Sequence, residues 1–176
     1  EIRTWDDFRQ IPPMDKHEHR LAQEESLERF GHPYGMLACA PLEKFVLLSS
    51  TSGTTGTPTL YTLTAKDMQV LYELQARKFW RVGLRPGDRV LHAFSLSMFT
   101  AGIPWVMALQ QYGACVVPVG AELGSRRVLE FGQFVKPRVM TCTPSFAEYL
   151  IDKAPEIIGK PVRELGIELV ICAGEP

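Results

Sequence analysis

Short apolar runs alternate with helix-like segments through the second half of the sequence, and this alternation constrains the fold most strongly. The apolar runs, predicted to be strands, are residues 89–94, 114–119, 138–142 and 167–173. The segments between them, predicted to be helices, are residues 101–112, 125–135 and 143–154. Strands that are apolar on both faces and separated by helices are typical of a parallel sheet covered on both sides. The sequence therefore predicts an α/β fold built on a largely parallel sheet.

The first half of the sequence is organised differently. Residues 1–44 are polar and contain several prolines and a charged middle, so we expect a loosely helical lead-in without a core of its own. Residues 45–176 are expected to be part of an α/β nucleotide-binding domain. Two short strands at 45–49 and 59–63 enclose a polar loop, and a helix with one apolar face, which includes Phe79 and Trp80, is expected after Thr64.

Composition excludes several classes of partner. The 176 residues carry a net charge of −1, so no basic field favours nucleic acid or a membrane surface. The stretch from His92 to Ala121 has no charged residue and is long enough to span a bilayer. Glycine and proline residues divide it into short pieces, however, and we interpret it as strands and a helix of the α/β core.

The cysteines and histidines predict no disulfide and no metal site. Three of the four cysteines lie in apolar runs, which predicts buried free thiols in a reducing compartment. No signal-peptide pattern precedes the fold, so a cytoplasmic protein is expected. The spacing of His17, His19 and Cys39 fits no common metal site, and solvated side chains are the simpler interpretation.

The loop at residues 50–59, STSGTTGTPT, is the strongest candidate for ligand binding. Seven of its ten residues carry a hydroxyl group and two are glycine, so backbone N–H groups and hydroxyls can converge on phosphate oxygens. It is not a Walker A loop, because Gly53 and Gly56 are only three residues apart and no lysine follows. From composition alone, a flexible hairpin turn rich in serine and threonine remains an equal alternative.

The predicted topology indicates where a ligand would bind. In open parallel sheets, ligands bind outside the carboxyl ends of the strands. The segments expected at these ends are residues 94–99, 120–122, 143–145 and 174–176. The loop at 50–58 is expected to face the same region if it is functional. Thr143 is placed to cap a helix that has Pro144 at its first position.

Several stretches, in the right order, resemble a known family. TSGTTGTPT resembles the phosphate-binding signature of the adenylate-forming superfamily of acyl-CoA synthetases, and the chain is most similar to its phenylacetate–CoA ligase branch. The other stretches that carry the resemblance are HPYGMLA, LTAKDM, RVGLRPGDRVLHAF, SMFTAG, TPSFA and AGEP. The resemblance covers essentially the whole chain. Because members of this family are much longer, the chain is expected to be a fragment of the large N-terminal domain.

The resemblance implies a two-step reaction with ATP, Mg²⁺ and coenzyme A as cofactors. A carboxylate attacks the α-phosphate of ATP, and the thiol of CoA then displaces AMP. By the resemblance, the β- and γ-phosphates lie on Ser52, Gly53, Thr54, Thr55, Gly56 and Thr57. Thr57 departs from the lysine that many members carry there. The adenine is bordered by Gly174, Glu175 and Pro176. Phe94, Phe99, Thr143 and Pro144 line the pocket for an aryl acid, and the catalytic lysine lies outside the chain.

Other interpretations remain open. The acyl or nucleotidyl group could pass to an acceptor other than CoA, or the chain could be a non-catalytic nucleotide-binding module. Phe94 and Phe99 could be plain core residues. The expected partners are a small-molecule carboxylate and a second copy of the chain in a homodimer.

Overall fold

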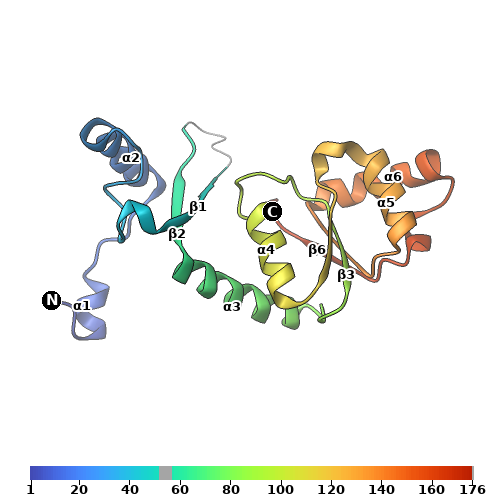
Figure 1. Cartoon of the computed structure of the whole chain (residues 1–176), viewed down its shortest axis with the longest axis horizontal. Helices are drawn as coiled ribbons and strands as arrows, with labels where there is room; N and C mark the ends of the chain where they lie inside the picture. The colour runs from blue at the N-terminus through green and yellow to red at the C-terminus, as the bar shows by residue number, and fades with distance from the viewer. Residues whose placement is uncertain (52–56, 176) are drawn as a thin grey trace. The chain divides into compact units, whose positions relative to one another are not determined.

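The computed structural model describes residues 1–51 and 57–175. The chain divides into two compact units, residues 1–64 and residues 65–176. Figure 1 follows the chain from its N-terminus in blue to its C-terminus in red. This division falls at the end of β2. The sequence predicted instead that the α/β domain begins at residue 45, and this domain boundary stays a prediction.

The first unit contains helices and a two-stranded hairpin. Its elements are α1 (Trp5–Arg9), α2 (Lys16–Phe30), a short 3₁₀ turn (Leu42–Lys44), β1 (Phe45–Ser50) and β2 (Leu60–Thr64). Helix α2 begins with a capping box, in which the Asp15 carboxylate accepts from the His17 and Glu18 N–H groups and the Glu18 side chain accepts from the Asp15 N–H. It ends at Gly31, whose φ of 74° suits a left-handed C-cap. Strands β1 and β2 pair antiparallel, with Ser50 opposite Leu60.

The second unit is the predicted α/β structure. Its elements, in chain order, are α3 (Ala65–Arg81), β3 (Arg89–His92), α4 (Ile103–Tyr112), β4 (Cys115–Pro118), a 3₁₀ turn (Ala121–Leu123), α5 (Gly124–Val135), β5 (Val139–Cys142), α6 (Pro144–Ile158), a second 3₁₀ turn (Val162–Leu165) and β6 (Leu169–Cys172). The strands form a sheet in the order β4-β3-β5-β6, and every neighbouring pair is parallel. The α/β fold class predicted from the sequence is therefore confirmed.

The sheet of the second unit is buried on both faces, because successive strand residues point to opposite sides. On β3, Val90 belongs to a cluster with Phe79, Trp105 and Leu109 of α3 and α4. The next residue, Leu91, belongs to a second cluster with residues of α5 and α6. Figure 1 shows the two helix pairs on opposite sides of this sheet. The continuous apolar character of the strands follows from this double coverage.

Three details differ from the sequence predictions. Trp80 was expected on the buried face of its helix, but it is 58% exposed and stacks against the Arg85 guanidinium, 3.9 Å from the ring centroid. Helix α6 does not end near residue 154 but continues through Pro155 to Ile158. Packing of Ala154, Ile157 and Ile158 into the core offsets the hydrogen bond that the proline removes. Cys115 and Cys172 are exposed rather than buried, although both are free thiols, as predicted.

Within residues 1–51 and 57–175, none of the helices combines the length and the apolar character that crossing a bilayer requires.

Candidate functional site

The carboxyl ends of the four parallel strands bring together the loops in which the sequence predicted a binding site. A buried polar pair lies at this edge, where His92 closes β3 and Thr141 lies in β5. The His92 Nδ1 and the Thr141 Oγ1 are 2.7 Å apart. Burial lowers the pKa of His92 to about 4. The Ala101 backbone and the Glu122 carboxylate act to raise this pKa, but their effects are smaller. The imidazole is therefore neutral at physiological pH and ties β3 to β5.

A carboxylate joins the loops that follow β5 and β6. Glu175 accepts hydrogen bonds from the Ser145 hydroxyl at 2.6 Å and from the Ser145 N–H at 2.8 Å. These bonds, the hydroxyl bond first, hold the pKa of Glu175 below its usual value. Gly174 has a φ of 90°, a backbone conformation that glycine adopts without strain. The turn that carries Gly174 and Glu175 is thereby fixed against the start of α6.

Thr143 and Pro144 take the local roles that the sequence predicted. Thr143 is the N-cap of α6, and its hydroxyl accepts from the Phe146 N–H at 3.3 Å. Pro144 occupies the first helical position, where its missing N–H costs no helical hydrogen bond. Both residues lie at the carboxyl end of β5, next to the turn held by Glu175. Their predicted role in the acyl pocket stays a prediction.

A second carboxylate joins the loops that follow β3 and β4. The Ser95 hydroxyl donates to the Glu122 carboxylate. Burial acts to raise the pKa of Glu122, but hydrogen bonds from Ser95 and nearby backbone outweigh it, so that this pKa lies below its usual value. Gly120 lies against this carboxylate, since a Cβ built there would be 2.3 Å from the Glu122 Oε2. Gly120 also has a φ of 71°, a left-handed conformation that favours glycine, so the loop leaving β4 requires glycine at this position.

The two phenylalanines predicted for an aryl pocket lie in different surroundings. Phe94 is buried and packs edge-on against Trp105, with ring centroids 5.3 Å apart. Phe99 is 39% exposed and follows in the same loop. The Lys78 ammonium lies 3.7 Å from the centroid of the Trp105 ring, and burial lowers the pKa of Lys78 to about 8. Phe94 thus has the packing of a core residue, while Phe99 is accessible to a ligand.

Most of the predicted phosphate-binding residues, Ser52, Gly53, Thr54, Thr55 and Gly56, lie outside the described residues, as does Pro176 of the predicted adenine border. The ends of the loop are described. The Thr51 N–H donates to the Thr59 carbonyl at 3.1 Å, and the two threonine hydroxyls are 2.9 Å apart. These bonds extend the β1–β2 pairing beyond the strands. That the loop faces the sheet edge stays a prediction.

Helix α2 makes contacts with the hairpin backbone that the sequence did not reveal. The Gln23 amide donates to the Pro58 carbonyl at 3.1 Å and accepts from the Leu60 N–H at 2.6 Å. The Arg20 Nε donates to the Thr57 carbonyl at 3.1 Å. Both side chains therefore bind the backbone that leads out of the hydroxyl-rich loop. The polar pattern of this helix could not have predicted these bonds, because it does not indicate partners so distant in the sequence.

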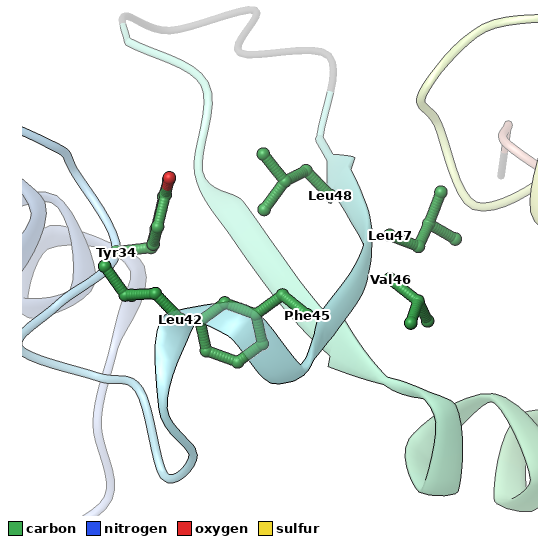
Figure 2. A pocket seen from close by; sticks show the side chains of 6 residues that line it. All are labelled: Tyr34, Leu42, Phe45, Val46, Leu47 and Leu48. Carbon is green, nitrogen blue, oxygen red and sulfur yellow. The ribbon is translucent and has the colours of Figure 1, made fainter.

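A hollow of about 260 Å³ lies at the base of the hairpin in the first unit. Figure 2 shows its lining residues, which are Tyr34, Leu42, Phe45, Val46, Leu47 and Leu48. The register of β1 against β2 shifts between Phe45 and Leu47. Consistent with such a bulge, Figure 2 shows Val46 and Leu47 on the same side of the strand. None of these lining residues is charged or belongs to the predicted site.

Comparison with known proteins establishes the family. The model of the AMP-binding enzyme family matches residues 10–176, and the chain belongs to this family. The chain is 33% identical over 145 residues to the phenylacetate–coenzyme A ligase of Thermus thermophilus, covering 82% of this chain and 32% of the relative. It is 26% identical over 171 residues to the enzyme of that name from Escherichia coli K12, covering 97% and 38%. The chain thus spans about a third of the length of these relatives.

The fold is also that of solved CoA ligases. A crystal structure of 2-hydroxyisobutyryl-CoA ligase in complex with 2-HIB-AMP and CoA superposes with a TM-score of 0.85 at 28% identity, covering 99% of this chain and 36% of that protein. The resemblance to the phenylacetate–CoA ligase branch, inferred from seven short stretches, is thereby confirmed. The binding roles of the individual residues stay predictions.

Proposed function

We propose that the whole protein is an ATP-dependent acid–thiol ligase that forms an acyl-adenylate and then an acyl-CoA. The observation that carries the proposal is the family match along residues 10–176. In the reaction, a carboxylate oxygen attacks the α-phosphate of ATP and pyrophosphate leaves. The CoA thiol then attacks the acyl carbon, and AMP leaves with the oxygen that came from the acid. Such chemistry depends mainly on positioning and on stabilising the phosphate charge.

The described residues fit a nucleotide site at the sheet edge. Glu175 is occupied by its two bonds to Ser145, so its role is to hold the turn at Gly174 rather than to act as a base. A fixed turn next to the N-terminus of α6 presents a rigid border for an adenine ring. Residues 52–57 are proposed to hold the β- and γ-phosphates. The neutral His92 keeps β3 and β5 in register behind this edge.

We propose that magnesium enters as a complex with ATP. Within the described ranges 1–51 and 57–175, no group of three histidine, cysteine, aspartate or glutamate side chains is placed to hold a metal ion. Mg²⁺ is commonly bound through substrate phosphates and few protein ligands. When bound, it would neutralise part of the phosphate charge.

The proposed acid is phenylacetate or a close aryl relative. The names of the curated relatives and the accessible ring of Phe99 support this choice. A short hydroxy acid is the second candidate, because the structure with a TM-score of 0.85 is of a 2-hydroxyisobutyryl-CoA ligase. One methylene in an apolar pocket changes preference by only about 1–3 kcal/mol, so the acid must be identified by experiment.

Exchange of labelled pyrophosphate into ATP by the full-length protein tests the proposal. The acids to compare are phenylacetate, benzoate, 2-hydroxyisobutyrate and a medium-chain fatty acid. We expect the fastest exchange with phenylacetate, and release of AMP that depends on CoA. Exchange without CoA-dependent AMP release would indicate another acceptor. A lack of exchange with every acid would contradict adenylation.

A further inference from the structure

Two cysteines lie side by side at the carboxyl edge of the parallel sheet. Cys142 ends β5, Cys172 ends β6, and the two residues are direct partners in the register of these strands. Neighbouring strands lie about 4.8 Å apart, and disulfide-bonded residues have Cα atoms about 4.4–6.8 Å apart. The register therefore places the two backbones at a distance that a disulfide bond can span.

Both thiols lie on the same face of the sheet. Cys142 is fully buried in the cluster covered by α5 and α6. On β6, Leu169, Ile171 and Ala173 pack on the cluster of the opposite face, so Cys172, which lies between the last two, points to the side of Cys142. Burial is the main cause that raises the pKa of Cys142 to about 12, and the neighbouring Cys172 thiol raises it further. The two sulfur atoms are therefore close to each other.

The two thiols differ in their access to solvent. Cys172 is exposed, whereas Cys142 is buried. A reagent in solution therefore reaches Cys172 first. Cys142 forms little thiolate at neutral pH, so it reacts with a group held beside it rather than with a dilute reagent. This asymmetry is that of an attacking thiol with a second thiol that resolves the first product.

The pair is next to residues with predicted roles in binding. Thr143 directly follows Cys142, and Gly174 and Glu175 come two and three residues after Cys172. The loops that follow the two cysteines are the ones that the Glu175 carboxylate joins. A disulfide needs Cβ atoms about 3.8 Å apart, which is less than the spacing of the strands, so the bond would draw the two strand ends together. The change would be passed directly to both loops.

We infer that Cys142 and Cys172 form a reversible disulfide that weakens nucleotide binding at the edge of the sheet. The effect on the nucleotide rests on the proposed function, whereas the disulfide itself does not. The oxidant is a low-molecular-weight disulfide, and a thiol reductant that reaches the exposed Cys172 sulfur reverses the reaction.

The reaction is a pair of thiol–disulfide exchanges. The Cys172 thiolate attacks one sulfur of the reagent, so a mixed disulfide forms and one reagent thiolate leaves. The Cys142 thiol then gives up its proton and attacks the Cys172 sulfur, and the second reagent thiolate leaves. The two protein thiols lose two electrons and two protons, and the reagent takes them up as it becomes two thiols.

Mass spectrometry tests the disulfide in the full-length protein. The folded protein is treated with oxidised glutathione and digested without reduction, and we expect a peptide pair linked through Cys142 and Cys172. In Cys142→Ala the reaction should stop at the glutathione adduct of Cys172. In Cys172→Ser, a change at an exposed position, neither product should form. Cys115→Ser is the matched control, because Cys115 is also exposed in this sheet but pairs with Arg89, and this variant should form the link as the wild type does.

Titration calorimetry with ATP tests the effect on the site and needs no turnover. We expect the Kd of ATP to be about tenfold higher for the oxidised than for the reduced full-length protein, within the usual range of coupling between two sites. Dithiothreitol should restore the lower Kd, and the oxidant should leave the Kd of Cys172→Ser unchanged. Absence of the linked peptides, or a linked protein with the Kd of the reduced one, would overturn the inference. A reduced protein that binds ATP but exchanges no pyrophosphate would refute the proposed function instead.

Discussion

The two units bury different kinds of side chain. Among the described residues, the buried hydrophobic side chains all lie between Met68 and Ile171, in the second unit. The buried side chains of the first unit are polar, and they are Gln23, Ser26, Ser49, Ser50 and Thr59. The second unit is therefore held by apolar packing on both faces of a sheet. The first unit depends on side chains that bind backbone groups.

This difference shows how each unit fixes the backbone near its own predicted binding residues. In the second unit the core fixes the strands, and the loops at their carboxyl ends need only a few bonds, such as those of Glu175. In the first unit the polar contacts themselves fix the geometry. Ser26 accepts from the Gly35 N–H at 2.6 Å and donates to the His32 carbonyl at 2.8 Å, as Gln23 does for the hairpin. The two units should therefore respond differently to substitution.

The largest expected effect is the loss of an aromatic ring from the core of the second unit. Phe79 is fully buried against Trp105 and Tyr112. We expect Phe79→Ala to lower the free energy of unfolding by about 3–5 kcal/mol. Denaturant titration followed by circular dichroism measures this change. The neighbouring Trp80→Ala should cost about 1 kcal/mol or less, because that ring is exposed, and equal losses would contradict the packing described.

The next largest effect is expected in the first unit. There a buried polar residue should contribute to stability, as a buried apolar residue does in the second unit. Gln23→Leu leaves the Leu60 N–H and the Pro58 carbonyl without their partners. We expect a local loss of about 1–3 kcal/mol, the cost of burying an unpaired backbone group. Hydrogen exchange at the Leu60 amide should become faster. The exposed Glu24→Leu is the control, and slow exchange in both variants would show that Gln23 does not hold the hairpin.

The polar pair in the second unit predicts a dependence of stability on pH. The pKa of His92 is about 4 in the folded chain and 6.5 for an ordinary histidine, so only the unfolded state takes up a proton between these values. Stability from this group is present above pH 6.5 and is lost as the pH falls toward 4. The slope is about 1.4 kcal/mol per pH unit.

The measurement is the free energy of unfolding between pH 7 and pH 4, compared with His92→Asn, whose amide does not titrate. The difference between the two proteins should change across this interval. Parallel curves would contradict a buried neutral imidazole.

The smallest effect concerns the turn at the edge of the sheet. Its carboxylate is exposed, and the Ser145 hydroxyl contributes most to the low pKa of Glu175. Ser145→Ala should raise that pKa toward its usual value, while Ser145→Thr should leave it low. Titration of the Glu175 carboxyl followed by NMR measures the shift. An unchanged pKa in Ser145→Ala would mean that the loops after β5 and β6 are not joined by this bond.

The same comparison explains how far the sequence could predict the structure. The parallel sheet was predictable because each strand is a short apolar run, and Thr143 and Pro144 mark the start of α6 by local rules. The contacts of α2 were not predictable from the sequence, because Gln23 binds backbone groups 35 and 37 residues away and no local pattern indicates such a partner. Trp80 was misplaced because its ring fits the apolar face by spacing, but an arginine rather than the core stacks against it.

The candidate site was predictable to a similar degree. Topology located the edge at which Glu175 and Thr143 lie, because parallel strands end together. It did not reveal Ser145 or His92 as the residues that join neighbouring strands or loops there. These bonds depend on the register of the sheet, which pairs Thr141 with His92 and Cys142 with Cys172.

The most direct test of the central claim is the fate of the carboxylate oxygen. The full-length protein is supplied with phenylacetate labelled with oxygen-18 in both carboxylate positions, together with ATP and CoA, and the AMP is analysed by mass spectrometry. An acyl-adenylate requires that one labelled oxygen appear in the phosphate of AMP. Unlabelled AMP, or label in inorganic phosphate with release of ADP, would contradict the proposed chemistry.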